Sequence, residues 1–236
     1  MSLPVTMYYC TQCDFQQGDG GTWGTREYVL GSGVRIPVRW QIGWCESCNG
    51  IAPIEDLSSS RRIQEYREAQ RTLSHLSQKS SNQWFLGLSK WERESLLRCE
   101  DKMQDAIDAL EMISIRKSPP HCLNCSSTQV HVPNKAESKV DGKSEEHVWR
   151  HIGCGGDIRA RLNDDGLRLA LRQSVQRYTP EGLFIEKEYV DGYSAPDDEY
   201  WDALKESNRR YRASNLSIQD DEGFVDFPKF LRKYAD

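Results

Sequence analysis

Four short pairs of cysteine and histidine residues constrain this chain more than any other feature of its sequence. Two residues separate the members of each pair, and the pairs are Cys10/Cys13, Cys45/Cys48, Cys122/Cys125 and His151/Cys154. This spacing turns two side chains of a short loop toward one point, and two such pairs supply the four ligands of a tetrahedral zinc ion. The pattern therefore predicts two structural zinc ions and a fold organised around them.

The order of the pairs along the chain favours one site in each half. The first predicted site consists of Cys10, Cys13, Cys45 and Cys48, and the second consists of Cys122, Cys125, His151 and Cys154. His151 is preferred to the other histidines of this region because it takes the place of Cys45 when the second pairs of the two halves are aligned. In both halves Gly or Asn follows the last ligand, and these residues tolerate the positive φ that lets backbone amides reach the ligand sulfurs.

Paired knuckles of this kind give the chain a resemblance to zinc-ribbon proteins, over residues 8–50 and 120–172. The resemblance implies short antiparallel strands around each ion, and it does not specify a function. Buried cysteines without a metal are the alternative at each site, and iron is an alternative at the four-cysteine site. The 31 residues between Cys13 and Cys45 exceed compact zinc-site spacing and leave room for an extended hairpin.

A helical hairpin is expected between the two ribbons. Apolar residues recur at helical spacing from Ile63 to Leu76 and again from Leu96 to Ile115. The sequence from Ser89 to Glu92 has the pattern of a capping box, which predicts the start of the second helix. Strand-like segments with turns then follow Cys154, and a helix is expected after Pro196.

The predicted fold class is α+β, with two small antiparallel zinc-ribbon modules flanking an α-helical hairpin and a mixed hairpin and helical extension at the C-terminal end. Four domains are expected. They are an N-terminal zinc ribbon at 1–57, the helical hairpin at 58–118, a second ribbon with added β-hairpins at 119–192 and an acidic, aromatic helical tail at 193–236.

The expected location is the cytoplasm. The chain begins without a charged segment followed by an apolar one, and its apolar runs are shorter than a membrane span. In a reducing compartment, cysteine pairs at this spacing indicate a metal, although disulfides remain the alternative if the chain is exported.

Catalysis has no support in the sequence, and a non-catalytic protein is expected. Four protein ligands leave a zinc ion no open position for water, so both sites are predicted to be structural. The sequence before Cys122 lacks the His-x-Glu of a zinc deaminase, and an interleaved cross-brace is disfavoured because about 70 residues separate the two halves. An enzyme with a site assembled by the fold is the weakest alternative, with Asp197, Asp198 and Asp202 as its candidates.

The first hypothesis for function is a protein-interaction adaptor or regulator, which requires a protein partner and no membrane. Residues 179–236 carry 8 Lys and Arg against 14 Asp and Glu, together with several aromatic residues that would favour partner contacts if exposed. The alternative is that these aromatic residues pack the tail onto the helical hairpin. These aromatic residues are Tyr189, Tyr193, Tyr200, Trp201, Tyr211, Phe224, Phe227 and Phe230.

The second hypothesis is nucleic-acid binding through arginines of the second ribbon. The candidates are Arg150, Arg159, Arg161, Arg168 and Arg172. Arg159 and Arg161 alternate along one predicted strand and so share a face. The alternative is a solvated outer face without a ligand, because no segment of the chain is strongly basic.

Overall fold

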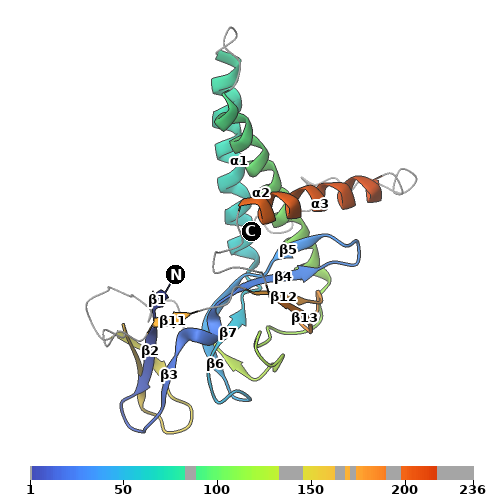
Figure 1. The fold of residues 1–236 in the computed structure, drawn as a ribbon. Helices are drawn as coiled ribbons and strands as arrows, with labels where there is room; N and C mark the ends of the chain where they lie inside the picture. Colours follow the sequence, from blue (N-terminus) through green and yellow to red (C-terminus); the bar gives the residue numbers. More distant parts are fainter. Residues whose placement is uncertain are drawn as a thin grey trace.

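In the computed structural model, a pair of long helices projects from a body of small β-sheets, and another helix lies across the pair (Figure 1). The structure describes residues 2–82, 89–132, 146–162, 168–170, 174–189 and 198–216. Helices and small, mostly antiparallel sheets confirm the predicted α+β class. The predicted domain boundaries stay a prediction.

The helical hairpin consists of α1 (Ser59–Asn82) and α2 (Lys90–Ile115), which pack against each other. The predicted capping box is confirmed at the start of α2. The Glu92 backbone N–H donates to Ser89 Oγ at 3.2 Å, and the Ser89 backbone N–H donates to Glu92 Oε2 at 3.0 Å. Two backbone amides that the helix itself cannot pair are thereby satisfied, which fixes where α2 begins.

The described strands form four sheets. The first pairs β1 (Ser2–Pro4) with β11 (Arg168–Ala170). The second has the order β3 (Gln16–Gly18), β2 (Thr6–Cys10), β10 (Asp157–Leu162), β9 (Glu146–Arg150). The third has the order β13 (Phe184–Tyr189), β12 (Ser174–Tyr178), β4 (Thr25–Val29), β5 (Arg35–Pro37). The fourth has the order β7 (Gly50–Glu55), β6 (Trp40–Cys45), β8 (Val130–His131), and a 3₁₀ turn, η1 (Asp19–Thr22), follows β3.

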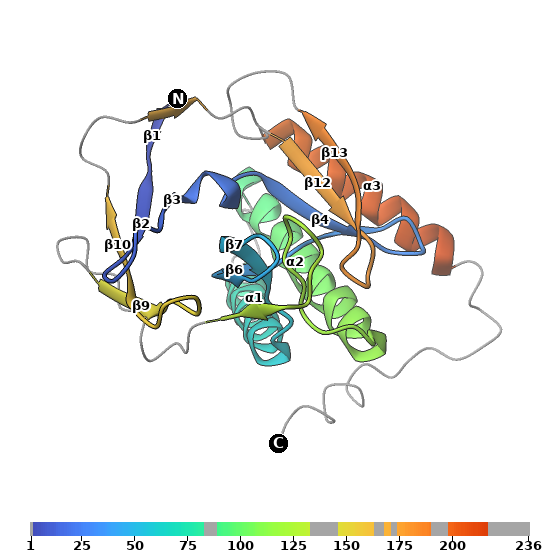
Figure 2. The same cartoon turned by 90° about the horizontal axis from the view of Figure 1, so that it is seen from below.

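Strands that lie far apart in the sequence are neighbours in all four sheets. β1 pairs antiparallel with β11, so that Leu3 lies opposite Leu169. β2 pairs antiparallel with β10, so that Cys10 lies opposite Ile158. β6 pairs antiparallel with β8, so that Cys45 lies opposite Val130. β4 pairs with β12 in parallel. Figure 2 shows β9, β10, β2 and β3 gathered on one side, β4, β12 and β13 on the other, and β6 and β7 between them.

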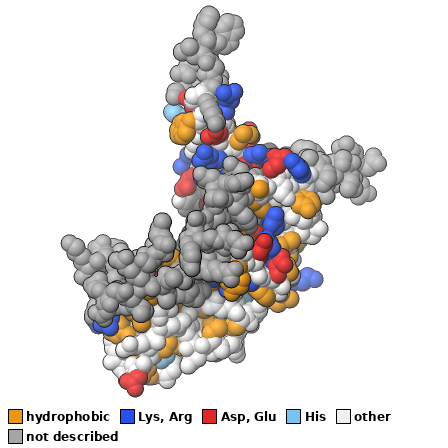
Figure 3. Space-filling view, in the orientation of Figure 1, with side chains coloured by type: hydrophobic (Ala, Val, Ile, Leu, Met, Phe, Trp, Pro, Cys, Tyr) orange, Lys and Arg blue, Asp and Glu red, His pale blue; other side chains and the backbone are white. Residues whose placement is uncertain are grey.

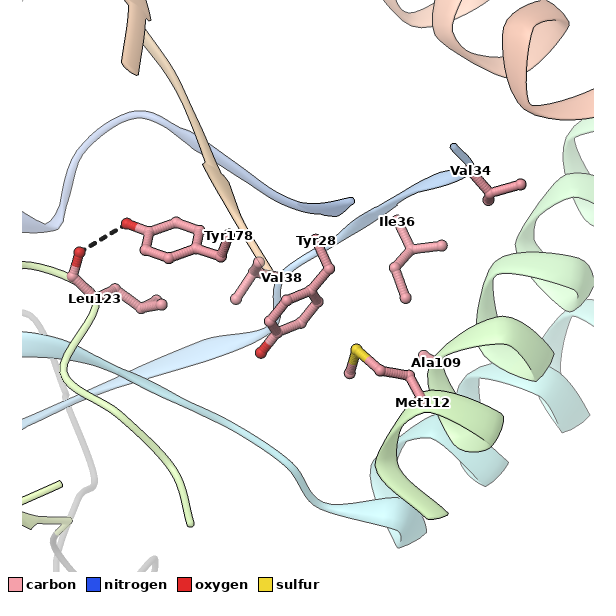
Figure 4. Packing of buried hydrophobic residues seen from close by; sticks show 8 residues of the cluster. All are labelled: Tyr28, Val34, Ile36, Val38, Ala109, Met112, Leu123 and Tyr178. Carbon is pink, nitrogen blue, oxygen red and sulfur yellow. Dashed lines mark hydrogen bonds between the residues drawn. The ribbon is translucent and has the colours of Figure 1, made fainter. Parts of the chain in front are cut away.

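The largest hydrophobic core lies between the third sheet and α2. Tyr28 and Ile36 of the sheet pack against Ala109 and Met112 of the helix, and each of these four side chains is at most 3% exposed (Figure 4). Tyr178 closes the other end, where its hydroxyl donates to the Leu123 carbonyl at 2.6 Å. This core ties the helical hairpin to β-strands from both the start and the end of the chain.

A buried ion pair lies beside this core. Glu55, at the end of β7, accepts from Arg116 Nη1 at 2.9 Å and from Arg116 Nη2 at 2.6 Å, and neither side chain is more than 1% exposed. Glu55 also accepts from the Tyr28 hydroxyl at 2.6 Å and from the His121 backbone N–H at 2.7 Å. A buried carboxylate needs such partners because desolvation of an unpaired charge is costly.

The third described helix, α3 (Asp198–Leu216), is attached to α2 through ion pairs. Arg209 bonds Asp101 at 2.8 Å, and Arg212 bonds Asp108 at 2.6 Å. Since α3 begins at Asp198, the predicted helix after Pro196 is confirmed. The Tyr211 ring packs against Gly33, where a Cβ would lie 3.0 Å from the ring.

Candidate metal centres

The structure gathers the four predicted pairs into two groups, each with four potential metal ligands. Cluster A contains Cys10, Cys13, His151 and Cys154, and cluster B contains Cys45, Cys48, Cys122 and Cys125. Within each cluster the candidate ligand atoms all lie within 4.8 Å of one another. These are the groups of three or more His, Cys, Asp or Glu side chains with metal-binding geometry among the described residues.

The distances fit a tetrahedral ion. Bonds of about 2.3 Å from zinc to sulfur place two sulfur ligands about 3.8 Å apart. In cluster A the sulfurs of Cys10 and Cys154 are 3.4 Å apart, and His151 Nδ1 lies 3.3 Å from the Cys13 sulfur. In cluster B, Cys45 and Cys125 are 3.5 Å apart, and Cys48 and Cys122 are 3.8 Å apart. Each cluster can therefore enclose one ion without rearrangement of the backbone.

The predicted assignment of pairs to sites is wrong, although the eight residues are those that the sequence singled out. The first pair joins the fourth, and the second joins the third. Strand pairing is the physical reason. β2 and β10 place the first and fourth knuckles side by side, while β6 and β8 place the second and third side by side. The arrangement is nested, with cluster B formed by pairs that lie between those of cluster A.

The knuckles have the backbone geometry that orients sulfur ligands. The Gln12 backbone N–H points at the Cys10 sulfur at 3.4 Å, and the Cys48 backbone N–H points at the Cys45 sulfur at 3.5 Å. Such amides stabilise thiolate ligands. The expected positive φ after the last ligand is confirmed at Asn49 (49°) and Gly155 (74°), and Ser126 also has a positive φ of 59°.

Gly156 lies against cluster A. A Cβ at this position would be 2.7 Å from the Cys10 sulfur, which is closer than van der Waals contact permits. The glycine therefore allows the fourth knuckle to approach the first closely enough for the two pairs to share an ion.

The thiols of the two clusters differ in their electrostatics. Burial raises the pKa of Cys10, but amide N–H groups and the neighbouring Cys154 and His151 side chains outweigh it and lower the value to about 6. Burial raises the pKa of Cys122 to about 12, because its surroundings disfavour a bare thiolate and the adjacent Cys45 adds to the effect. Burial and the neighbouring thiols also raise the pKa of Cys48. A metal cation would displace the protons of these thiols on binding.

Aromatic rings surround the histidine of cluster A. The His151 ring centroid lies 4.7 Å from that of Trp44 and 5.2 Å from that of Phe15, and His151 is 8% exposed. Trp44 also directly precedes Cys45, a member of cluster B. One buried tryptophan thus contacts a ligand of one cluster and is bonded to a ligand of the other.

Sequence reasoning missed the residues that support the clusters. Phe15 and Trp44 carry no motif, and their proximity to His151 depends on pairing between strands from opposite ends of the chain. Glu55 could have been suspected from its position, since it ends a buried apolar segment and its charge would need a partner. Its partner Arg116, at the end of α2, could not be identified from the sequence.

Three of the remaining histidines and the eighth cysteine lie outside both clusters, and the side chain of His147 is not among those that the structure describes. His121 Nδ1 is 2.9 Å from Arg116 Nη2, and His131 Nε2 is 2.6 Å from Glu46 Oε1. His75 is exposed on α1. Cys99 is buried on α2, as expected for a core residue.

The candidate arginines are only partly described. Arg159 lies opposite Tyr9 and Arg161 lies opposite Met7 on the β2–β10 pair, so the two arginines share a face, and the Arg161 guanidinium is 5.4 Å from the Tyr9 ring centroid. Arg150 is exposed at the end of β9. The side chain of Arg168 and the whole of Arg172 lie outside the described residues.

The side chains of the acidic candidates for an assembled active site also lie outside the part of the chain that the structure describes. Asp197 is outside it, and for Asp198 and Asp202 only the backbone of α3 is described. Among the aromatic residues of the tail, the side chains of Tyr189 and Tyr211 are described, and both are exposed. For Tyr200 and Trp201 only the backbone of α3 is described.

Among the described helices, none combines the length and apolar character that a membrane span requires. The predicted cytoplasmic location stays a prediction. In comparisons with models of protein families, with curated proteins and with solved structures, the chain has no significant match.

Proposed function

We propose that this chain is a non-catalytic protein in which two structural zinc ions hold together a scaffold that binds a protein partner. The observation that carries the proposal is the closed donor set of each cluster, with four side-chain ligand atoms within 4.8 Å of one another. Sulfur and imidazole ligands in a tetrahedral arrangement favour zinc. A metal with four protein ligands has no position for a substrate or a reactive water.

The position of the clusters supports a structural role. Each cluster joins two segments separated by more than 70 residues, so an ion in it would close a long loop. Two hydrophobic core groups lie beside the clusters, and each contains only four buried residues. One comprises Tyr8, Trp44, Ile51 and Ile158, and the other comprises Cys45, Ala52, Ile54 and Cys122. Metal binding would supply folding free energy that such small groups lack.

The partner-binding part of the proposal is supported by exposed apolar side chains on the ordered scaffold. Leu183, Phe184 and Ile185 are each about half exposed at the start of β13. Clustered exposed side chains of this type favour protein contacts.

Elemental mass spectrometry of protein purified without chelator tests the zinc assignment. We expect two zinc ions per chain. Replacement by Co²⁺ should give the intense visible absorption of tetrahedral thiolate sites, and added azide should leave that spectrum unchanged because neither site has an open position. A spectrum that azide shifts would indicate an exchangeable ligand and contradict the structural role. Iron in place of zinc would contradict the assignment of the metal.

Nucleic-acid binding remains the second candidate, favoured by the shared face of Arg159 and Arg161 beside the Tyr9 ring. Arginine next to an aromatic ring is a combination used to hold single strands, and Tyr9 is partly buried. Fluorescence anisotropy with a labelled single-stranded oligonucleotide at low salt tests it. Binding that weakens with salt and is lost in Arg159→Gln/Arg161→Gln, but not in the α3 control Arg210→Gln, would favour this candidate.

A further inference from the structure

The two edges of the sheet β13-β12-β4-β5 differ in how their backbone groups are satisfied. At the β5 edge, the Arg35 backbone N–H donates to Asn208 Oδ1 at 2.9 Å, and Asn208 Nδ2 donates to the Arg35 carbonyl at 2.6 Å. One side-chain amide from α3 thus occupies the positions that another strand would use, which blocks strand addition there. At the other edge, β13 has a single neighbour, β12, among the strands that the structure describes.

The side chains of β13 are exposed along its whole length. All six residues of Phe184–Tyr189 are exposed, as is the preceding Leu183. Leu183 and Phe184 are each 52% exposed, Ile185 is 47% exposed and Tyr189 is 49% exposed. The Phe184 ring contacts Tyr178 at a centroid distance of 5.9 Å, so part of it is anchored on the core while the rest faces outward. β13 also carries the charged residues Glu186, Lys187 and Glu188, and its register with β12 shifts between Arg177 and Tyr178. Charges and irregular pairing discourage unspecific strand addition, so this edge favours a segment of complementary charge.

Charge is distributed unequally over the two faces of β13. Arg177 of β12 bonds Glu186 at 2.6 Å and Glu188 at 2.7 Å, which places both carboxylates on one face. The buried Glu27 lies 3.6 Å from Arg177 and 3.9 Å from Arg35. Three carboxylates therefore share two guanidinium groups, and this face is net acidic. On the other face, the Lys187 ammonium lies 4.9 Å from the Tyr189 ring centroid. In Figure 3, acidic and hydrophobic side chains lie next to each other in the region of β12 and β13.

These observations bear on the occupant of the edge. Antiparallel self-pairing of β13 about Lys187 would place Lys187 opposite its own copy and Glu186 opposite Glu188. Like charges directly opposite each other destabilise a strand pair, so this register disfavours a second copy of this chain as the occupant. A strand with basic side chains toward Glu186 and Glu188 and apolar side chains on its other face complements both the charge and the apolar surface.

We infer that β13 is the docking edge for an extended segment of a partner protein in which basic and apolar residues alternate. The inference rests on the proposed partner-binding function and specifies where and how the partner binds. Backbone hydrogen bonds along the edge supply affinity, and the acidic face selects basic side chains. The knuckles keep their metals in the complex, since β13 lies outside both clusters.

NMR titration of the metal-loaded, ¹⁵N-labelled full chain tests the inference with synthetic peptides. The probe is a short, end-blocked peptide in which lysine alternates with valine. We expect its chemical-shift changes to centre on Phe184–Tyr189. A peptide with glutamate in place of lysine, or with N-methyl groups on alternate backbone amides, should bind at least about tenfold more weakly, since it loses the charge or the backbone bonds.

Two variants on β13 locate the contact. Ile185→Lys should weaken the lysine–valine peptide at least about tenfold, whereas Ile115→Lys, at an exposed site on α2, should leave its affinity unchanged. Glu186→Gln/Glu188→Gln should reduce the preference for the lysine peptide over the glutamate peptide. The matched control is Glu206→Gln on α3, whose carboxylate also bonds an arginine, Arg210.

Several results would overturn the inference. They are the absence of peptide binding, shifts centred away from β13, and equal affinity for the N-methylated peptide. A dimer that Ile185→Lys converts to monomer would assign the edge to a second copy instead. Metal analysis of the same samples separates the two proposals. Two zinc ions per chain without peptide binding refutes only the docking edge, whereas fewer than two refutes the proposed scaffold.

Discussion

Clusters A and B have the same ligand spacing but different surroundings. Cluster A has one buried cysteine, Cys10, and its histidine lies among aromatic rings at the end of the β2–β10 pair. Cluster B has two cysteines, Cys45 and Cys122, that are 0% exposed. It lies beside the Glu55 ion pair, because Cys122 forms an isolated antiparallel β-bridge with Ile54, the residue before Glu55. Cys122 also follows His121, whose backbone N–H donates to Glu55.

This difference indicates that the same chemical unit has two structural roles. Cluster B joins the strands of the first half to the segment that leaves α2, so it is part of the junction between the helical hairpin and the sheets. Cluster A joins β2 to β10 and their knuckles at one side of the molecule (Figure 2). Loss of the metal should therefore have global consequences at cluster B and more local ones at cluster A.

Removal of one ligand from each cluster is the strongest test of this comparison. Cys122→Ser should abolish the cooperative thermal transition, because structural zinc contributes on the order of 10 kcal/mol and this site lies at the junction of the elements. Cys154→Ser, at an exposed position of cluster A, should lose one metal but retain a cooperative transition. Circular dichroism melts, with metal analysis of each sample, measure both effects. Equal destabilisation by the two variants would contradict the comparison.

The buried ion pair gives the next largest effect. Arg116→Met leaves the Glu55 carboxylate buried without its main partner, which should cost about 3–5 kcal/mol. The double variant Glu55→Gln/Arg116→Met should recover part of that loss, because it removes the buried charge. Urea denaturation measures the free energy of unfolding. An effect of Arg116→Met below about 1 kcal/mol would mean that the pair does not support the junction next to cluster B.

Trp44 offers a way to weaken one cluster through its surroundings. Trp44→Leu removes the ring that packs on His151 and should reduce the metal affinity of cluster A by about 10- to 100-fold, the usual effect of residues that orient a ligand. Trp91→Leu serves as the control, because Trp91 is 65% exposed on α2. Competition with a chelator measures the affinities. A larger loss at cluster B would show that Trp44 acts mainly through its neighbour Cys45.

The thiol pKa values predict a difference in pH dependence. Metal binding displaces protons from thiols, so the affinity of both clusters falls as the pH falls. In cluster A the pKa of one thiol is lowered (Cys10) and that of one is raised (Cys154), whereas in cluster B the pKa of one is lowered (Cys125) and those of two are raised (Cys48 and Cys122). Metal binding to cluster B should therefore release about one proton more near neutral pH. For each unit by which the pH falls between pH 8 and pH 6, the zinc affinity of cluster B should therefore decrease about tenfold more than that of cluster A. One additional proton corresponds to about 1.4 kcal/mol per pH unit. Zinc titrations at several pH values, in variants that retain one cluster, measure the two slopes. Equal slopes would contradict the prediction.

The sequence identified the candidate ligands because knuckle chemistry is local. Two residues between ligands, followed by a residue that accepts positive φ, can be recognised without knowledge of the fold, and Asn49 and Gly155 have the expected conformation. The same holds for α2, whose capping box depends only on Ser89 and Glu92. Local rules of this kind predicted the elements and the residues of the sites.

The pairing of the knuckles could not be predicted because it depends on contacts between distant strands. The register that places Cys10 opposite Ile158 spans almost 150 residues, and nothing in either knuckle specifies its partner. The one available signal was the long segment between Cys13 and Cys45, which exceeds the spacing of a compact site. The support from Trp44, Glu55 and Arg116 depends on the same long-range packing and was likewise beyond local rules.

The nested pairing of the knuckles is the central claim, and the metal content of two double variants tests it most directly. Cys10→Ser/Cys45→Ser removes a ligand from each cluster, whereas Cys10→Ser/Cys154→Ser removes two ligands from cluster A alone. We expect the first variant to bind no zinc and the second to retain one ion per chain. Retention of one ion by Cys10→Ser/Cys45→Ser, together with loss of both by Cys10→Ser/Cys154→Ser, would show that each half of the chain binds its own metal and would contradict the structure.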